Sequence, residues 1–462
     1  MTEDAGPAIR PVMTTSKLKA LLALSLGVCA CACDSRPGSP ESSAFTEPSP
    51  ELFPPPPPLE VLPLPPPIAV NRHKELLVTD RAILAGARSD GARADAPWSF
   101  RHLVEKLAAP GDASAFVRTW LASWEATSTA PAEGNLALSH RPDVRAELVC
   151  PWLRLTPENG CDATCSQCTS AHLDLTRAPF RLLAVVNRLD LAEETTGCNE
   201  DASEARFVFL ATRPGTSTPL SFNVIFEYGA NGTSAGDPKE WHALASVPDG
   251  GYVAALERVT RSVTDRTQAS LKQLRTSENL GTAHGTSWEL RQFGLVNHDL
   301  VPSALTNTAR DAIDGTTELA DHVDSHFSEI ASGDNAITTA LRTAVSTMPR
   351  ADFRWSDPRG TSQQLDLFGL STCNGCHAGH RGDTTILPFS HIGADERGET
   401  VVSRFLDDPT NPLADELSFR ERSLSRRLQG QCGSPEASYG GRRGGGGGGG
   451  GLEKQPNVQR VH

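Results

Sequence analysis

Low-complexity segments at both ends limit the part of this chain that can fold. Residues 34–70 are dominated by Pro, Ser and Glu and contain the proline runs 54–58 and 65–67, a composition that cannot bury a hydrophobic core. We expect an extended polyproline II tether there, rising about 3.1 Å per residue. Residues 434–462 contain the glycine run 444–451 and are predicted to be disordered. The globular part is therefore predicted to lie within residues 71–433.

Hydrophobic periodicity within that part indicates both helices and strands. Apolar residues recur at helical spacing behind the potential N-caps Ser99 and Asp112, which predicts two early helices. Alternating or near-continuous apolar runs predict strands over residues 181–189, 207–210, 222–228 and 288–295. Later patterns predict helices over residues 239–244, 252–274, 316–332 and 335–348.

These elements together predict an α+β fold. We expect a central, mostly antiparallel sheet with helices over residues 71–350. A small, mostly helical segment over residues 351–433 is expected to follow it.

Residues 1–33 are typical of a bacterial lipoprotein signal. A basic n-region follows Met13, a short apolar run covers residues 20–28, and small residues separate the cysteines that come next. Met13 is the expected start, because the preceding residues are partly acidic. The apolar run is too short to span a bilayer as a helix. We therefore expect a lipid on Cys31, with Cys33 as the alternative, to hold the protein at the inner or outer membrane of the cell envelope.

The charge balance and the missing motifs argue against several functions. The net charge of −13 is spread without a basic stripe, which argues against a nucleic-acid partner. The sequence contains no Gly-x-Ser-x-Gly nucleophile elbow and no phosphate-binding loop. It therefore does not favour a hydrolase or a transferase.

The motif Cys373-Asn374-Gly375-Cys376-His377 has the spacing of a c-type haem attachment site. One helical turn brings both sulfurs to one edge of a porphyrin, and His377 then lies under the iron as proximal ligand. Resemblance to cytochromes c is confined to these five residues. No methionine follows His377 in the chain, so a sixth ligand would be solvent or a histidine. His391, beyond a turn, is the best candidate.

Two other interpretations of this motif stay open. A Cys-x-x-Cys pair can close a small disulfide in an oxidising compartment. Cys373, Cys376 and His377, with His391, can alternatively surround a tetrahedral zinc ion. With haem the protein is expected to carry electrons or sense redox state, and to have a redox protein partner. Without haem it is expected to be a non-enzymatic binding or structural lipoprotein of the envelope.

Six cysteines lie outside both the signal and the Cys-x-x-Cys-His motif, and in an exported chain they are most simply disulfide-bonded. The cluster of Cys161, Cys165 and Cys168, with Cys198 as a fourth ligand, is an alternative zinc site. The set consists of Cys150, Cys161, Cys165, Cys168, Cys198 and Cys432.

Several blocks of the chain resemble a family of uncharacterised exported lipoproteins of myxobacterial type. Those proteins similarly place a Thr-Cys-Asn-Gly-Cys-His block near the C-terminus and follow it with a Phe-x-His-Ile element, here Phe389-Ser390-His391-Ile392. The resemblance covers residues 95–425. It implies a shared fold and an exported location, and it carries no established activity. The other blocks are FRLLAVVNRLDL at 180–191, ARFVF at 205–209, VIFEY at 224–228, WHAL at 241–244 and WELR at 288–291.

Overall fold

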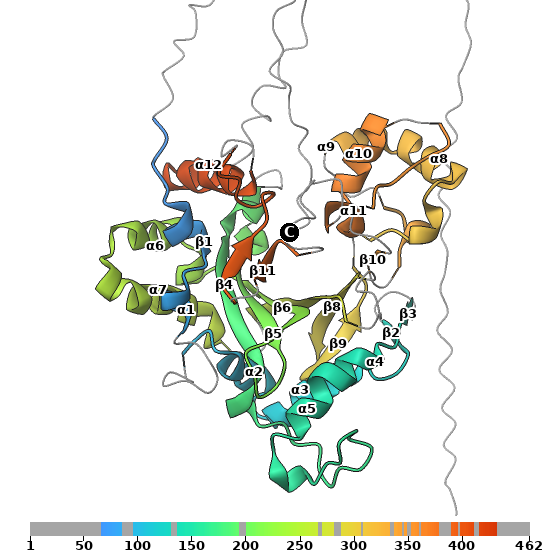
Figure 1. Ribbon diagram of the computed structural model, residues 1–462. Coiled ribbons are helices and arrows are strands. Elements are labelled where there is room, and N and C mark those ends of the chain that lie inside the picture. Colours follow the sequence, from blue (N-terminus) through green and yellow to red (C-terminus); the bar gives the residue numbers. More distant parts are fainter. Residues whose placement is uncertain are drawn as a thin grey trace, which may run out of the picture. The chain divides into compact units, whose positions relative to one another are not determined.

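An eight-stranded antiparallel sheet forms the centre of the protein in the computed structural model (Figure 1). The strand order is β1-β4-β5-β6-β7-β8-β10, and β9 pairs with β8 off this path. The strands are β1 Leu77–Val78, β4 Phe180–Arg188, β5 Glu204–Thr212, β6 Pro219–Gly229, β7 Leu271–Glu278, β8 Trp288–Val296, β9 Asp299–Ser303 and β10 Ser346–Met348. The structure describes residues 66–85, 96–130, 136–193, 200–266, 270–280, 288–305, 308–332, 337–343, 346–348, 353–359, 362–377, 390–395, 398–410 and 415–431.

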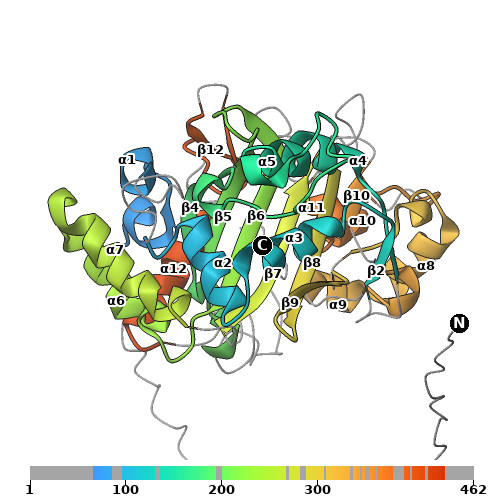
Figure 2. The ribbon, with the colours of Figure 1, turned by 90° about the horizontal axis from the view of Figure 1, so that it is seen from below.

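One face of the sheet carries the main hydrophobic core. The helices α2 (Phe100–Ala108) and α3 (Ala113–Ala122) lie across this face, as Figure 2 shows. The Phe100 ring stacks on Phe180 of β4 with the centroids 4.2 Å apart. Trp120 of α3 meets Phe293 of β8 edge-on at 6.1 Å. These large buried rings, together with the aliphatic side chains beside them, bury the apolar area that fixes the two helices on the sheet.

The C-terminal elements lie on the other side of the sheet (Figure 1). They include α10 (Ser362–Leu370), α11 (Cys373–His377) and α12 (Glu416–Leu428), together with a two-stranded ribbon of β11 (Ile392–Ala394) and β12 (Thr400–Val402). All of them belong to the unit that spans Pro65–His462. The C-terminal segment is therefore packed on the sheet.

The remaining elements surround these two layers. A second ribbon pairs β2 (Ser128–Ala130) with β3 (Leu136–Leu138). The other helices are α1 Arg81–Leu84, α4 Pro142–Val144, α5 Cys150–Leu153, α6 Pro238–Ala243, α7 Asp249–Thr264, α8 Thr317–Ser325 and α9 Phe327–Ser332. Single 3-10 or π turns cover Arg72–Leu76, Arg145–Val149, Pro157–Asn159, Leu175–Arg177, Leu189–Glu193, Glu200–Ala202, Ser234–Gly236, Leu244–Ser246, Asp311–Ile313 and Thr339–Leu341. Across the described ranges, every helix is too short or too polar to cross a bilayer.

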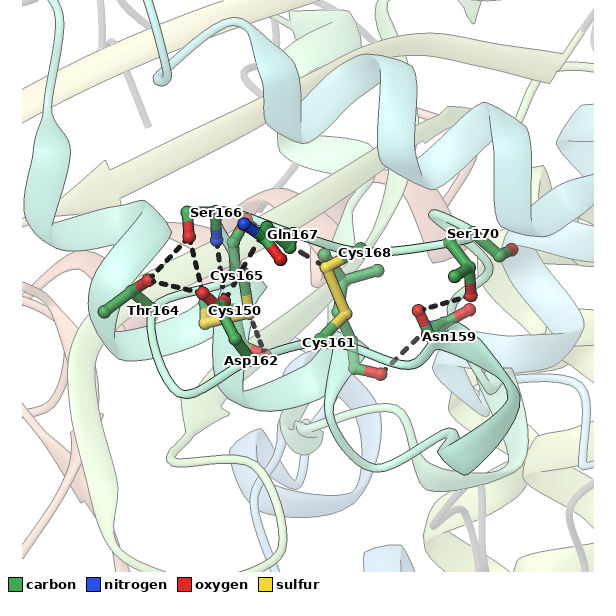
Figure 3. Close-up of a disulfide and its surroundings, with 12 residues drawn as sticks. Cys150, Asn159, Cys161, Asp162, Thr164, Cys165, Ser166, Gln167, Cys168 and Ser170 are labelled. Carbon is green, nitrogen blue, oxygen red and sulfur yellow. Dashed lines mark hydrogen bonds between the residues drawn. A yellow bond between two sulfur atoms is a disulfide. The ribbon is translucent and has the colours of Figure 1, made fainter.

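Two disulfides staple the loop that follows α5 (Figure 3). Cys150 is bonded to Cys165, and Cys161 is bonded to Cys168. Both bonds close short loops, which lowers the conformational entropy of the unfolded chain. Cys198 and Cys432 lie outside the described residues.

The structure confirms the α+β fold with a central antiparallel sheet. The two early helices begin at the predicted caps, since Ser99 Oγ accepts the His102 N–H and Asp112 Oδ1 accepts the Ser114 N–H. Four predicted strands correspond to β4, β5, β6 and β8. Residues 34–65 of the predicted tether, the predicted tail over residues 434–462 and the lipoprotein cysteines Cys31 and Cys33 lie outside the described residues.

Two predicted helices are wrong in part. The helix predicted over residues 252–274 ends with α7 at Thr264, and Leu271–Glu278 is strand β7. A shift of register opposite Glu227 and Tyr228 puts Leu271 and Leu274 at buried positions, so a bulged strand imitates the helical i, i+3 spacing. The helix predicted over residues 335–348 is instead a 3-10 turn followed by β10.

Candidate functional site

The face of the sheet opposite α2 and α3 is polar. In β5, Phe207 faces the aromatic core, so its neighbour Arg206 points to the other side. The register places Arg206 opposite Glu227 of β6, and Ile225 opposite Arg275 of β7. Alternation along adjacent strands therefore gathers charged side chains from several strands on one surface.

Ion pairs hold these side chains in place. Arg188 makes a bidentate contact with Asp190 at 3.0–3.1 Å, and the Arg188 side chain is fully buried. Arg206 lies between Glu204, at 2.7 Å, and Glu227, at 3.6 Å. Such arrangements fix the orientation of each guanidinium before any ligand arrives.

The carboxylates of this network remain ionised. Burial disfavours the charge on Asp190, but the guanidiniums of Arg188 and Arg420 outweigh that effect and hold its pKa below the usual range. Glu227 is buried as well, and Arg206 and Arg275 likewise lower its pKa. For Arg420, on α12, the charged form is disfavoured, because burial and the nearby charge of Arg188 lower its pKa to about 10.

The motif at 373–377 forms a tightly packed turn above this face. Thr372 Oγ1 accepts hydrogen bonds from the Gly375 N–H at 3.1 Å and from the Trp355 indole N–H at 3.0 Å, and it donates to Gly369 O at 2.9 Å. A Cβ on Gly375 would lie 2.4 Å from Gly369 O. The position between the two cysteines of the motif therefore requires glycine.

His377 and His391 come together at the edge of the polar face. The His377 ring stacks on Trp288 with a centroid distance of 4.8 Å, and it lies 4.6 Å from the His391 ring. His391 Nδ1 is 3.2 Å from Ser403 Oγ, and its ring lies 4.8 Å from Phe405. The structure thus brings together the two histidines that the sequence analysis singled out.

A cleft of about 90 Å³ separates this histidine pair from the polar face. Of the described residues in its wall, four are arginines and Glu227 is the only acid. Asn223, Ser277 and Ser390 supply neutral polar groups, and aliphatic side chains complete the wall. The charged and polar members are Arg188, Arg206, Arg275, Arg420, Glu227, Asn223, Ser277, Ser390, His377 and His391.

The two cysteines of the motif are not among the described residues that line that cleft. Cys373 and Cys376 are buried thiols that are not joined in a disulfide. Cys373 packs in a second hydrophobic cluster that includes Trp355 and Phe368. Burial raises the pKa of Cys373 to about 11. A thiol in this state is a poor nucleophile, which argues against rapid thiol–disulfide exchange.

Around this motif, the described residues bring no set of three or more metal-ligating side chains together. Within the described ranges, the one set of three or more metal-ligating side chains that converges to 4.8 Å is Cys161, Cys165 and Cys168. Their sulfurs are engaged in the two disulfides, so a metal there would require both bonds to be reduced.

The arginines of the cleft were not predicted from the sequence. A usable signal exists in two apolar strands, because Arg206 lies between the buried Ala205 and Phe207, and Glu227 lies between the buried rings of Phe226 and Tyr228. A charge at such a position points to the second face of the sheet. No family model, curated protein or solved structure matches this chain.

Proposed function

We propose that this chain is an exported, lipid-anchored protein of the cell envelope that binds a small anion in the cleft below His377 and His391. The observation that carries the proposal is the group of four arginines in the cleft wall, where Glu227 is the one acid among the described lining residues. Asp190, Glu204 and Glu416 pair with Arg188, Arg206 and Arg420 from outside that wall. Buried ion pairs contribute little net stability, so the stability of the fold does not account for this surface. Preoriented guanidiniums recognise carboxylate and phosphate groups.

The size of the cleft limits the ligand. A volume of about 90 Å³ corresponds to about three water molecules at ~30 Å³ each. Pockets that enclose drug-sized molecules are about 300–1,000 Å³. A short dicarboxylate or inorganic phosphate suits this space, with Asn223 and Ser277 as neutral hydrogen-bonding groups.

The sequence supports the location of this binding module. The signal over residues 1–33 and the proline-rich tether over residues 34–70 fit a folded unit attached through a lipid on Cys31 or Cys33. In this proposal the tether lifts the cleft away from the membrane surface.

Isothermal titration of the purified protein with succinate and with phosphate tests the proposal. We expect saturable binding of one of them, and at least tenfold weaker binding in Arg275→Gln, which removes a charge that the cleft uses. Arg258→Gln is the matched control, because Arg258 pairs with Glu240 on the protein surface at 2.6 Å, away from the cleft. Absence of binding to both anions would reject the proposed function.

Covalent haem is the second candidate, favoured by one observation. Cys373, Cys376 and His377 share one helical turn, and His391 lies beside His377. A bound haem would supply electron transfer. To admit it, the two imidazoles, now 4.6 Å apart, must separate and the thiols must leave their packing.

An absorption spectrum in alkaline pyridine decides this point, after expression with the c-type maturation apparatus. Covalent haem that is lost on combining Cys373→Ala with Cys376→Ala would establish a cytochrome and displace the anion proposal. Zinc analysis of the same sample tests the remaining interpretation, in which Cys373, Cys376, His377 and His391 hold a metal.

A further inference from the structure

A second, larger cavity lies at one end of the central sheet. Its volume is about 490 Å³, within the range of pockets that enclose small organic ligands. It is formed by the start of β4, the end of β5, the loop between β5 and β6, α1 and the turn between β11 and β12. None of its described lining residues also lines the cleft at His377, so the two sites are separate.

The wall of this cavity combines apolar and cationic groups. Leu84, Phe180 and Leu182 are buried side chains that form an apolar part. Arg81, Arg177 and Arg181 also line it, and among the described lining residues there is no acid. Hydroxyl groups of Thr212, Thr216, Ser217 and Thr400 add hydrogen-bonding capacity.

The charges are held at the cavity in different ways. Arg177 Nη1 donates to the backbone oxygen of Leu155 at 3.0 Å, a contact that orients the guanidinium without neutralising it. Arg81 pairs with Glu399 at the rim. The Arg181 guanidinium passes close to Gly398, where a Cβ would lie 2.6 Å from Nη1. Gly398 has a φ of +78°, so this turn position suits glycine for two reasons.

We propose that this cavity binds an amphiphilic anion, a molecule with a carboxylate or phosphate head and a short apolar tail. The guanidiniums would contact the head, and the Leu84, Phe180 and Leu182 side chains would cover the tail. An apolar floor alone would accept neutral molecules equally well. The arginines add the selectivity for charge.

Calorimetric titration with octanoate, octyl phosphate and 1-octanol tests this inference. At least one of the two anions should bind ten times or more tightly than octanol, and the tighter anion identifies the head group. Arg177→Gln should weaken that binding at least tenfold. Because Arg177 is exposed, this variant should fold normally, which circular dichroism verifies.

Arg213→Gln is the matched control. Arg213 lies on the loop between β5 and β6, which contributes Gly215, Thr216 and Ser217 to the cavity. It pairs with Glu147 and does not itself line the cavity, so its replacement should leave octanoate affinity unchanged. Equal binding of octanol and both anions, no binding of either anion, or unchanged affinity in Arg177→Gln would overturn the inference. Succinate binding at the other cleft should be the same in Arg177→Gln, which keeps the two proposals distinguishable.

Discussion

The imidazole ring of His377 lies 4.6 Å from that of His391, although His377 ends helix α11 and His391 immediately precedes strand β11. The Trp288 indole stacks on His377 and is itself fixed to the sheet, because its Nε1–H donates to Ser277 Oγ at 2.8 Å. This chain of contacts connects the Cys-x-x-Cys-His turn to the sheet and closes one side of the arginine-lined cleft.

The contact between the two histidines should be measurable as an energetic coupling. In a double-mutant cycle of His377→Ala and His391→Ala, we expect a coupling of about 0.5–1.5 kcal/mol. Either single change already removes the contact between the rings, so the double variant should lose less unfolding free energy than the two single variants added together. Urea unfolding of the four proteins measures it. Strictly additive losses would show that the rings do not interact in solution.

Gly375→Ala should destabilise the protein by about 1–3 kcal/mol, since its Cβ would press on Gly369 O at 2.4 Å. Gly250→Ala is the matched control. Gly250 lies in α7 with nothing within 4 Å of a new Cβ, so the change should stabilise the helix by about 0.5–1 kcal/mol. Equal effects of the two changes on the urea midpoint would contradict the packing described for the motif.

Glu278 should make the stability depend on pH. Burial, opposed by Arg141 and aided by Glu289, raises the pKa of Glu278 from 4.5 to about 8. The folded state then holds the proton on Glu278 more tightly than the unfolded chain does. The stabilisation that this proton adds to the unfolding free energy is therefore complete below pH 4.5 and is lost as the pH rises through 8. Glu278→Gln should therefore reduce the loss of unfolding free energy between pH 5 and pH 9. If the unfolding free energy of the wild type and of Glu278→Gln changed equally with pH, the role of Glu278 would be ruled out.

The disulfide between Cys150 and Cys165 should stabilise the fold substantially. It joins residues 15 positions apart, and closing a loop of about that length is worth about 3 kcal/mol. Replacing both cysteines with alanine should lower the unfolding free energy by about that amount, while added zinc should leave the wild-type protein unchanged. Stabilisation by zinc would indicate that the cysteine cluster binds metal instead.

The apolar periodicity of the sequence was sufficient to predict much of the fold. Helices α2 and α3 directly follow the N-caps Ser99 and Asp112, because a local capping hydrogen bond and one apolar face specify each of them in the sequence. Strand β7 was missed because its bulge gives Leu271 and Leu274 a helical spacing, and only the pairing with β6 resolves that ambiguity. Strand β10 depends in the same way on a distant partner, β8.

The candidate site was predicted only in part. The sequence analysis singled out His377 and His391, and the fold places their rings 4.6 Å apart. Their role as ligands of a haem or a metal stays a prediction. Arg188, Arg206 and Arg275 come from three strands, and Arg420 comes from α12. Their convergence follows from strand register and helix packing, which a single sequence does not specify.

The affinity of Glu227→Gln for the anion that binds the cleft tests the central claim most directly. Glu227 is the one acid among the described residues of the cleft wall, and it contacts Arg206 and Arg275 at 3.6 and 3.5 Å. Removing its charge should tighten anion binding about tenfold, or ~1.4 kcal/mol, while the loss of buried ion pairs lowers the unfolding free energy. Unchanged or weaker binding in a folded Glu227→Gln protein would contradict an anion site in this cleft.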